Sequence, residues 1–512
     1  MAGADDSTEV ELTLRLAPKS VARLLRDPLL RKLEHGPRKT SRLVSTYFDT
    51  ADFRLRREQA ALRVRRIGTR RIQTLKFTPK PKAGILARRE WERELDSGMP
   101  DLRDIDDRHV RKLLNSDIKD KLEPIFVTEI RRSTVPLRLD GSAIELAVDV
   151  GEIKSDRGNL KVCEAELELK SGRIESVYKL AQALAKRVPM TVEPRSKSER
   201  GYALVTDAKP APRRAQSVRL AKDMPAGLAF QVIARSCLLH LRANEASVRS
   251  AAGADSVHQL RVAVRRLRSA LVAFGDLMPR DERHRVSGSV RWIAQECGRA
   301  RELDVFLADV VQPLLARLPG EKNLERFAEL VEAARRDAYS TIAATLESKE
   351  YTDTLLALEA WVEGDRWRKA DGADIPIRSF AKTVLKRLHR KLTKGVGKVE
   401  ELDEEALHRL RIRAKKLRYA SEFFRSLFPG GSAKAYIGLL TTIQDRLGTL
   451  NDALVARQIV ASFKDQGRMS DDTAFARIAG AVLGWNACRI AADMKRLPAA
   501  WEEFRSAESF WK

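Results

Sequence analysis

The second half of this 512-residue chain contains an internal duplication. The segment HQLRVAVRRLR, which starts at His258, recurs as HRLRIRAKKLR, which starts at His408, an offset of 150 residues. Two further landmarks recur in the same order at nearly the same offset: His240 with His389, and Gly298–Val305 with Gly448–Val455. Both copies have the periodicity of helices. The duplication therefore predicts two helical halves that pack face to face with pseudo-twofold symmetry.

The first part of the chain has a different periodicity. Alternating apolar and polar residues predict strands at 9–16, 61–66, 144–149 and 163–170. Residues 206–218 are interrupted by Pro210 and Pro212 and are typical of a linker. We therefore expect an α+β protein with a strand-rich domain at residues 1–205, a linker at 206–218 and an all-α domain at 219–505. The two helical repeats are expected at about 226–365 and 376–505.

Charge and cysteine content limit the partners and the compartment. The formal net charge is +25, which favours an anionic partner such as nucleic acid, polyphosphate or an acidic membrane surface. The four cysteines lie far apart without metal-binding spacing, which favours free thiols in a reducing compartment. The N-terminus lacks the pattern of a signal peptide, and no apolar run is long enough to span a membrane. We expect a cytoplasmic protein.

Several predicted strands carry columns of like charge. Since residues i and i+2 of a strand share a face, four columns form: Glu9 with Glu11, Arg63 with Arg65, Glu90 with Glu92 and Glu94, and Glu164 with Glu166 and Glu168. Any one column is compatible with a solvated outer face. Together they favour a closed sheet, because like charges about 7 Å apart repel by roughly 2 kcal/mol unless opposite charges face them. Carboxylates bind divalent cations, and Arg and Lys bind phosphate oxygens, so such a lumen suits a metal-bound polyphosphate.

These strands resemble the CYTH, or triphosphate tunnel metalloenzyme, family. EVELTLRL is similar to the ExExK opening of the family, and eight segments follow in family order over about residues 7–205: TYFDT, LRVRR, TLKF, RREWE, FVTEIRR, IELAVDVGEI, CEAELEL and SKSERGY. The resemblance implies an eight-stranded antiparallel β-tunnel with helices. It also implies hydrolysis of inorganic tripolyphosphate or a related triphosphate, with Mg²⁺ or Mn²⁺ as cofactor. Adenylate cyclase activity and RNA 5′-triphosphate processing are alternatives within the same family.

The resemblance also implies roles for individual residues. The implied metal ligands are Glu9, Glu11, Glu90, Glu92, Asp149, Glu164, Glu166 and Glu168, with Glu145 and Glu152 as further tunnel candidates. The implied phosphate contacts are Arg63, Arg65, Lys76, Arg132, Lys197 and Arg200. The implied catalytic set is Glu9, Glu11, Arg63, Arg65, Lys76, Arg132, Glu164, Glu166 and Lys197. Thr13 replaces the Lys of the motif, and Arg15 on the same face is the candidate that compensates by binding phosphate. Without this compensation, we expect either slow turnover or a domain that binds triphosphate and does not cleave it.

Each repeated helical segment carries a cationic stripe. Helical spacing places His258, Arg261, Arg265 and Arg268 on one stripe, and His408, Arg411, Lys415 and Arg418 on the other. A solvated cationic face is the alternative, but the repetition favours an anion-binding groove. The segments resemble the CHAD family over about residues 219–505, which implies binding of inorganic polyphosphate. The expected polyphosphate-binding residues are His240, His258, Arg261, Arg265, Arg266, Arg268, Lys386, His389, Arg390, His408, Arg411, Lys415, Lys416 and Arg418.

The order of the two domains resembles that of bacterial inorganic triphosphatases. The leading hypothesis is therefore a metal-dependent triphosphatase whose helical domain binds polyphosphate, with polyphosphate granules as a candidate location. A non-catalytic polyphosphate-binding scaffold is the alternative. Nucleic acid is the less favoured partner, because aromatic residues make up only 6% of the chain and are not interleaved with the basic stripes.

Overall fold

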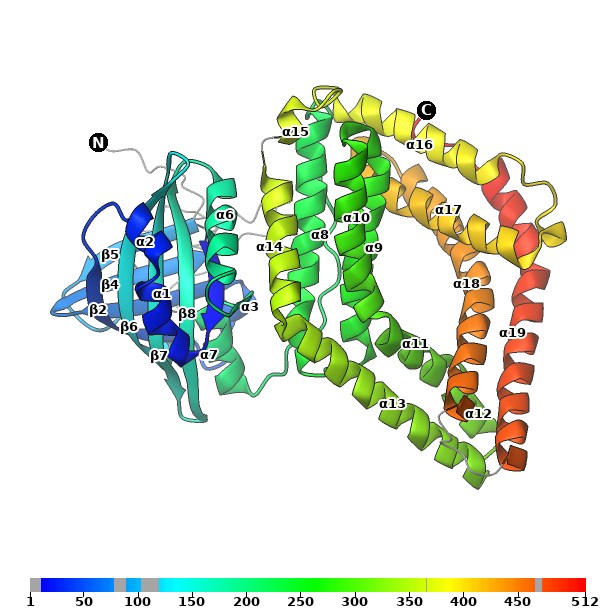
Figure 1. Ribbon diagram of the computed structural model, residues 1–512, viewed down its shortest axis with the longest axis horizontal. Helices are drawn as coiled ribbons and strands as arrows, with labels where there is room; N and C mark the ends of the chain where they lie inside the picture. The colour runs from blue at the N-terminus through cyan, green and yellow to red at the C-terminus, as the bar shows by residue number, and fades with distance from the viewer. Residues whose placement is uncertain (1–10, 78–88, 103–117, 119, 365, 466–471) are drawn as a thin grey trace. The chain divides into compact units, whose positions relative to one another are not determined.

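The computed structural model describes residues 11–77, 89–102, 118, 120–364, 366–465 and 472–512. The chain forms two compact units. The sheet unit comprises residues 1–210 together with residues 347–364, and the helical unit comprises residues 211–346 and 365–512. The segment 347–364 thus lies outside the continuous helical domain that was expected for residues 219–505. Figure 1 shows the strands of the one unit and the helices of the other.

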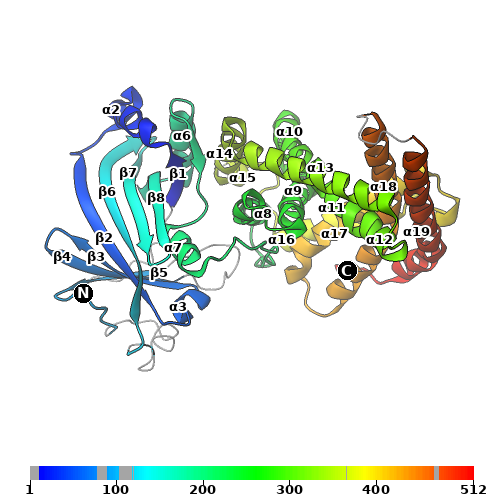
Figure 2. The ribbon, with the colours of Figure 1, turned by 90° about the horizontal axis from the view of Figure 1, so that it is seen from below.

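Among its described residues, the sheet unit contains one antiparallel sheet of nine strands in the order β5-β4-β3-β2-β6-β7-β8-β1-β9. The strands are β1 (Glu11–Leu16), β2 (Lys39–Asp49), β3 (Ala60–Ile67), β4 (Arg70–Phe77), β5 (Arg89–Leu95), β6 (Glu123–Leu139), β7 (Ser142–Ser155), β8 (Gly158–Ser171) and β9 (Met190–Val192). The sheet is strongly curved, as a tunnel-like fold requires (Figure 2). The α+β class is confirmed, but the expected count of eight strands is too low, because the short strand β9 extends the sheet beyond β1.

Strand alternation separates a core face from a polar face in this sheet. In β1, Leu12, Leu14 and Leu16 are buried, whereas Glu11, Thr13 and Arg15 point to the other face. The helices of the unit are α1 (Val21–Leu25), α2 (Pro28–Leu33), α3 (Arg54–Arg57), α6 (Ile174–Ala185), α7 (Lys197–Thr206) and α14 (Lys349–Glu363). Helix α14 packs on α6 and β9, and the side-chain amide of Gln182 donates a hydrogen bond of 2.9 Å to the carbonyl of Leu356.

The helical unit is formed by eleven α-helices in the part of the chain that the structure describes. They are α8 (Ala226–Arg249), α9 (Ala254–Ala273), α10 (Arg280–Glu296), α11 (Gly298–Phe306), α12 (Gln312–Arg317), α13 (Lys322–Glu347), α15 (Arg366–Lys369), α16 (Ile377–Thr393), α17 (Glu404–Phe424), α18 (Ser432–Asp465) and α19 (Asp472–Ser506). None of the helices in the described ranges is long and apolar enough to cross a membrane.

The two halves of the helical unit meet through reciprocal hydrogen bonds. The amide of Ala226, at the start of α8, donates to the carbonyl of Ile375 at 2.9 Å. The amide of Ile377, at the start of α16, donates to the carbonyl of Met224 at 2.8 Å. Such an exchange of equivalent bonds is what a twofold relation between the repeats requires. The repeats also differ, because Cys297 separates α10 from α11 whereas α18 is continuous.

Candidate functional site

Strand register places the predicted charged columns on one face of the sheet. Paired residues of neighbouring antiparallel strands share a face. The connecting pairs are Arg15–Glu164, Thr13–Glu166, Glu164–Asp149, Asp149–Arg132, Arg132–Ser41, Ser45–Arg65, Tyr47–Arg63, Arg63–Thr74 and Lys76–Glu90. Acidic strands β8 and β7 and basic strands β3 and β4 therefore contribute to the same surface, which we call the charged face.

Three carboxylates come together on the charged face. Asp149, Glu164 and Glu166 each offer an oxygen that lies within 4.8 Å of the other two. Two cations reach this carboxylate cluster. The ammonium of Lys197 lies 2.7 Å from Asp149 Oδ2, 2.5 Å from Glu164 Oε1 and 2.5 Å from Glu166 Oε1. Arg132 donates two hydrogen bonds of 2.7 and 2.6 Å to Asp149 and a third to Glu166.

Helix α7 brings Lys197 to the carboxylate cluster. A capping box starts the helix, because Ser196 Oγ accepts from the Glu199 amide at 3.1 Å and the Ser196 amide donates to Glu199 Oε2 at 2.9 Å. Lys197 therefore occupies the first turn. Arg200 follows on the same turn and donates to Glu164 Oε2 at 2.5 Å. The SKSERGY segment thus supplies both the helix start and two cations of the site.

Opposite charges perturb the pKa values of Glu166 and Lys197 in the cluster. Burial raises the pKa of Glu166, but the charges of Lys197 and Arg132 outweigh it and hold that pKa well below its ordinary value. Burial likewise lowers the pKa of Lys197, but Glu166, Asp149 and Glu164 hold it above its ordinary value. At neutral pH Lys197 is therefore charged and Glu166 is anionic.

The donor set fits a hard divalent cation such as Mg²⁺ or Mn²⁺. Three carboxylates within reach of one point are the ligands that these ions prefer. In addition, Glu164 Oε1 is buried and makes no hydrogen bond of good geometry among the described residues, although the Lys197 ammonium is close. A buried carboxylate oxygen without a directional partner is available for an ion. Glu11 lies on the same face of β1 as Thr13, which pairs with Glu166 in the sheet.

A second, basic group lies on strands β3 and β4 of the charged face. Arg63 Nε is buried and has no hydrogen-bond partner within the described ranges. Arg65 Nε donates to Ser45 Oγ at 3.1 Å, and burial lowers the pKa of Arg65 to about 10, which still leaves it charged. Lys76 pairs with Glu90 at 3.0 Å. These cations form a surface that can bind the oxygens of a phosphate chain.

The remaining predicted residues of the sheet unit lie outside the carboxylate cluster. Glu9 falls outside the described residues. Glu92 accepts from Thr74 Oγ1 at 2.9 Å, and Glu168 pairs with Lys170 at 2.6 Å. Glu152 lies on the opposite face, where it pairs with Lys154 at 3.1 Å, so its assignment to the tunnel was wrong.

Arg15, which was expected to compensate for Thr13, has other partners. It forms an ion pair with Glu347 and donates to Thr191 Oγ1 at 3.3 Å. Thr13 itself donates to Glu11 Oε1 at 3.2 Å. The opening strand therefore presents a hydroxyl where the family motif presents an ammonium.

In the helical unit, the two predicted stripes converge where α9 packs against α17. Burial, together with the nearby charges of Arg301 and Arg265, lowers the pKa of His258 to about 4, so its ring is neutral at pH 7. His258 Nδ1, Arg265 Nε and Arg411 Nε are buried without a hydrogen-bond partner in the described part of the chain. Buried donors of this kind normally have a partner, so the groove is incomplete without an anion or solvent.

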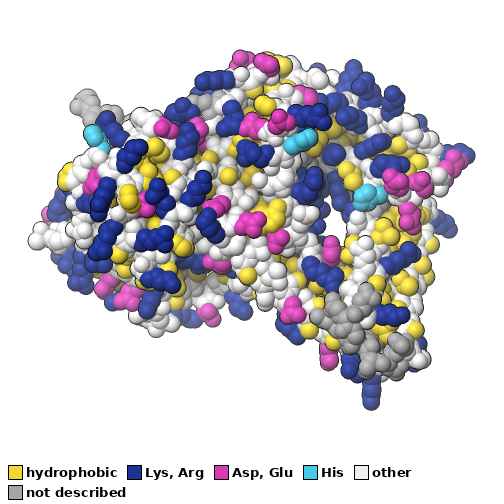
Figure 3. All heavy atoms as spheres, in the orientation of Figure 1, with side chains coloured by type: hydrophobic (Ala, Val, Ile, Leu, Met, Phe, Trp, Pro, Cys, Tyr) yellow, Lys and Arg dark blue, Asp and Glu magenta, His cyan; other side chains and the backbone are white. Residues whose placement is uncertain are grey.

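Lys415 lies in the same groove. Burial, together with the charges of Arg411 and Arg265, lowers the pKa of Lys415 to about 7, although Asp452 opposes this shift. In the space-filling view, the helical unit is hollowed between α9 and α18, and Lys and Arg side chains gather around the hollow (Figure 3). The accumulation of like charge is the electrostatic pattern of a polyanion site.

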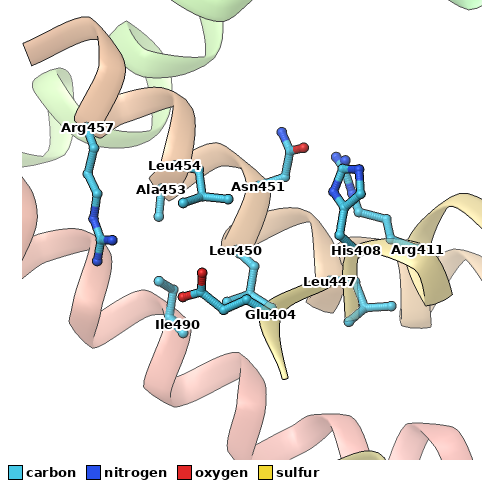
Figure 4. Close-up of a pocket in the computed structure, with 10 residues that line it drawn as sticks. All are labelled: Glu404, His408, Arg411, Leu447, Leu450, Asn451, Ala453, Leu454, Arg457 and Ile490. Atoms are coloured by element: carbon cyan, nitrogen blue, oxygen red, sulfur yellow. The ribbon is translucent and has the colours of Figure 1, made fainter. Parts of the chain in front are cut away.

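A pocket adjoins the second stripe. Its lining includes His408 and Arg411 of α17, which lie side by side, and Asn451 and Arg457 of α18 (Figure 4). Glu404 and four aliphatic residues of α18 complete much of the remaining wall, namely Leu447, Leu450, Ala453 and Leu454. His408 is exposed and accessible to a ligand.

Several other predicted residues of the helical unit have structural partners. His240 is buried, with Nε2 2.9 Å from the carbonyl of Arg213, and His389 Nδ1 lies 2.8 Å from the hydroxyl of Tyr436. Arg266 lies over the ring of Phe423. Arg418 donates to Gln444 at 3.0 Å and to Glu422 at 2.6 Å. These contacts bind helices to one another.

The outer part of the groove is formed by exposed cations. Arg268, Lys386 and Arg390 are exposed. The pKa of Lys416 is lowered by burial and by the neighbouring charges of Lys391 and Arg268. The site prediction did not include Arg301 and Lys391. Arg301 belongs to the third repeated landmark, so the duplication itself was the signal that could have found it.

Two family models match the chain: the CYTH match lies within the sheet unit, whereas the CHAD match spans the helical unit and includes the segment 347–364. The CYTH domain family matches residues 7–202, and the CHAD domain family matches residues 232–461. A crystal structure of the CHAD domain from the plant Ricinus communis is 30% identical, with a TM-score of 0.50, and the match covers 58% of this chain and 99% of that one.

Two curated relatives match about two fifths of the chain. The inorganic triphosphatase of Haemophilus influenzae is 28% identical over 197 residues, which are 38% of this chain and 54% of the relative. An uncharacterized protein of Mycobacterium tuberculosis is 32% identical over 211 residues, which are 40% of this chain and 39% of the relative. The matches therefore span about half or less of these relatives. The chain belongs to the CYTH and CHAD families, with a CYTH domain followed by a CHAD domain.

Proposed function

We propose that the sheet unit hydrolyses inorganic tripolyphosphate or a related triphosphate with Mg²⁺ or Mn²⁺, and that the helical unit binds inorganic polyphosphate. The observation that carries the proposal is the carboxylate cluster of Asp149, Glu164 and Glu166, which shares one sheet face with Arg63, Arg65 and Lys76. The similarity to an inorganic triphosphatase supports this choice of reaction.

The residues of the charged face have separate roles in the proposed reaction. A divalent ion on Asp149, Glu164 and Glu166 would neutralise phosphate charge and activate a water for attack. Arg63, Arg65 and Lys76 bind the phosphate oxygens and fix the chain in position. Arg132 holds Asp149 through two hydrogen bonds and thereby orients the carboxylate cluster.

Phosphate release from tripolyphosphate with Mg²⁺ or Mn²⁺ tests the tunnel reaction. The double variant Glu164→Ala, Glu166→Ala should lose activity by about 100-fold or more, because it removes two charged groups that act on the transition state. The matched control is Glu129→Ala, Glu152→Ala, which removes two carboxylates from the opposite face, where both pair with Lys154. This control should retain activity.

The same assay separates the alternatives. Absence of phosphate release with either ion, together with retained polyphosphate binding, would contradict the enzymatic proposal and leave a two-domain polyphosphate binder. Formation of cyclic AMP from ATP, without release of phosphate from tripolyphosphate, would point to a cyclase.

Polyphosphate binding by the helical unit is supported by the unpartnered donors of its groove. The variant Arg265→Ala, Arg411→Ala should bind polyphosphate at least about tenfold more weakly, because both side chains lie at the centre of the groove. The control variant Arg285→Ala, Arg409→Ala removes two exposed arginines and should bind nearly as the wild type does. Affinity should also fall linearly with the logarithm of salt concentration. Equal loss in both variants would show that net charge alone is recognised.

A further inference from the structure

Lys197 lies at the centre of the carboxylate cluster. We propose that its ammonium is an internal counter-cation, which occupies the position of the divalent ion in the ion-free protein and must leave before the ion can bind. This inference rests on the proposed metal-dependent function. It makes Lys197 a residue that controls ion occupancy, in addition to its predicted contact with phosphate.

The geometry makes the ammonium and the ion mutually exclusive. Lys197 Nζ is 2.7 Å from Asp149 Oδ2, 2.5 Å from Glu164 Oε1 and 2.5 Å from Glu166 Oε1. An ion that these same oxygens coordinate at about 2.0–2.6 Å would lie almost where the nitrogen now lies. Both cannot occupy that point, so the ion can use these three oxygens only after the ammonium has moved.

The other cations of the site can remain in place when Lys197 leaves. Arg132 holds Asp149 Oδ1 through Nε at 2.7 Å and also contacts Glu166 Oε2. Arg200 holds Glu164 Oε2 at 2.5 Å. On each of the three carboxylates, an arginine therefore contacts the oxygen that Lys197 does not contact. The ion would replace the lysine contacts, and it would share Asp149 Oδ2 with Arg132, whose Nη2 also donates to that oxygen at 2.6 Å.

Lys197 is also the cation best able to move. Its charge lies at the end of a flexible four-carbon chain, whereas each guanidinium is a planar group fixed by its donors. The capping box fixes the backbone of Lys197 at the start of α7. The ammonium can therefore leave the carboxylate cluster by side-chain rotation, without displacement of the helix.

Charge balance predicts that ion and phosphate bind together. Three carboxylates are balanced by three cations, namely Lys197, Arg132 and Arg200. If a divalent ion enters and the ammonium stays nearby, the site gains two positive charges. A phosphate chain supplies the opposite charge and a new partner for the displaced ammonium. The ion should therefore bind weakly alone and more tightly with triphosphate.

Calorimetric titration of Mn²⁺ into phosphate-free protein tests the inference. Lys197→Met should bind Mn²⁺ about tenfold or more tightly than the wild type, because the ion no longer displaces a charge-assisted interaction. Lys197→Arg retains the charge and should remain a weak binder. Lys154→Met is the matched control: it removes a lysine of the opposite face, where it pairs with Glu129 and Glu152, and should change Mn²⁺ affinity by less than about threefold.

Thermal unfolding adds a readout that is independent of affinity. Metal-free Lys197→Met should melt below the wild type, because three buried carboxylates lose a cation, and Mn²⁺ should restore the loss. If this variant does not fold, Lys197→Met with Glu166→Gln removes one charge of each sign. Competition predicts that this double variant binds Mn²⁺ at least as tightly as the wild type, despite one carboxylate fewer.

The opposite results would overturn the inference. Wild-type or weaker Mn²⁺ affinity in Lys197→Met, or in the double variant where the single one does not fold, would show that Lys197 does not compete with the ion. Tight binding by Lys197→Arg as well would show the same. Either result would leave the triphosphatase proposal intact if phosphate release persisted in the wild type. Absence of both Mn²⁺ binding and phosphate release in every variant would overturn both proposals.

Discussion

At the residue scale, Lys415 of α17 shows how a binding groove can cost stability. Its neighbours are Arg411 and Arg418 on its own helix, Arg265 on α9 and Asp452 on α18. Burial, together with the charges of the surrounding arginines, lowers the pKa of Lys415 to about 7. A phosphate chain in the groove would favour the charged ammonium again. The charges of the groove therefore favour a bound anion, and they lower the stability of the folded protein when no anion is bound.

The stability of the protein should depend on pH through Lys415. In the unfolded chain, the pKa of this lysine returns to 10.5. Between about pH 7 and pH 10.5 the unfolded chain holds a proton that the folded protein has lost, so stability rises with pH across this window. Below pH 7 both forms are charged and the full penalty applies. Lys415→Met should therefore raise the melting temperature by a few degrees at pH 6 and by almost nothing near pH 10.5.

Differential scanning calorimetry in phosphate-free buffer measures this difference. Lys386→Met, on an exposed position of α16, is the control and should not change the melting temperature at either pH. An equal gain for Lys415→Met at both pH values would mean that the methionine acts through packing and that the lysine carries no charge penalty.

At the element scale, helix α14 connects distant parts of the sequence within the sheet unit. It packs on α6 and β9. Leu355 and Trp361 of α14 and Leu180 and Leu184 of α6 are buried. Arg15 of β1 reaches Glu347, which directly precedes this segment. The helix therefore covers the edge of the sheet that carries the opening strand of the site.

Leu355→Ala should destabilise the sheet unit by about 2–5 kcal/mol, the usual cost of a buried Leu→Ala substitution. Amide hydrogen exchange can locate the effect: peptides from α6 and β9 should exchange faster, whereas peptides from α9 and α17 should not. The control is Leu160→Ala in β8, where the leucine is 38% exposed. Faster exchange confined to the helical unit would contradict the assignment of α14 to the sheet unit.

Periodicity in the sequence indicates which face of a strand or helix a residue occupies, but not which distant segment that face contacts. Period-two alternation gave the face that carries Asp149 and Glu164, because each strand fixes its own faces without its neighbours. The family resemblance suggested Glu152 as a tunnel residue, but the alternation that includes Asp149 excludes it. The helical period located the stripes, but could not distinguish His258 in the groove from His240, whose partner is the carbonyl of Arg213. Helix α14 packs on residues that are distant in the sequence, so no local pattern predicts which apolar surface it covers.

At the scale of the whole molecule, both units are discontinuous in sequence, because the segment 347–364 of the sheet unit interrupts the helical unit. The chain leaves the sheet unit at residue 210 and returns to it for residues 347–364. The α13 helix ends at Glu347, where this return begins. The boundary between the two domains in the sequence therefore does not coincide with the boundary between the two compact units.

This discontinuity predicts how the sheet unit behaves when it is expressed alone. A chain that ends at residue 210 would expose the apolar surface of α6 that α14 covers, and exposed patches of this kind promote aggregation. Residues 1–210 should therefore melt at a lower temperature than the same chain with residues 347–364 attached through a flexible Gly/Ser linker. The control carries the same linker and segment with Leu355→Asp and Leu356→Asp, which cannot bury the helix.

Size-exclusion chromatography measures aggregation, and thermal unfolding followed by circular dichroism measures the melting temperature. Equal melting temperatures for the three chains would show that α14 contributes nothing to the sheet unit. Rescue by the native segment alone would show that the fold of the sheet unit needs residues 347–364, which lie at the end of the first expected helical repeat.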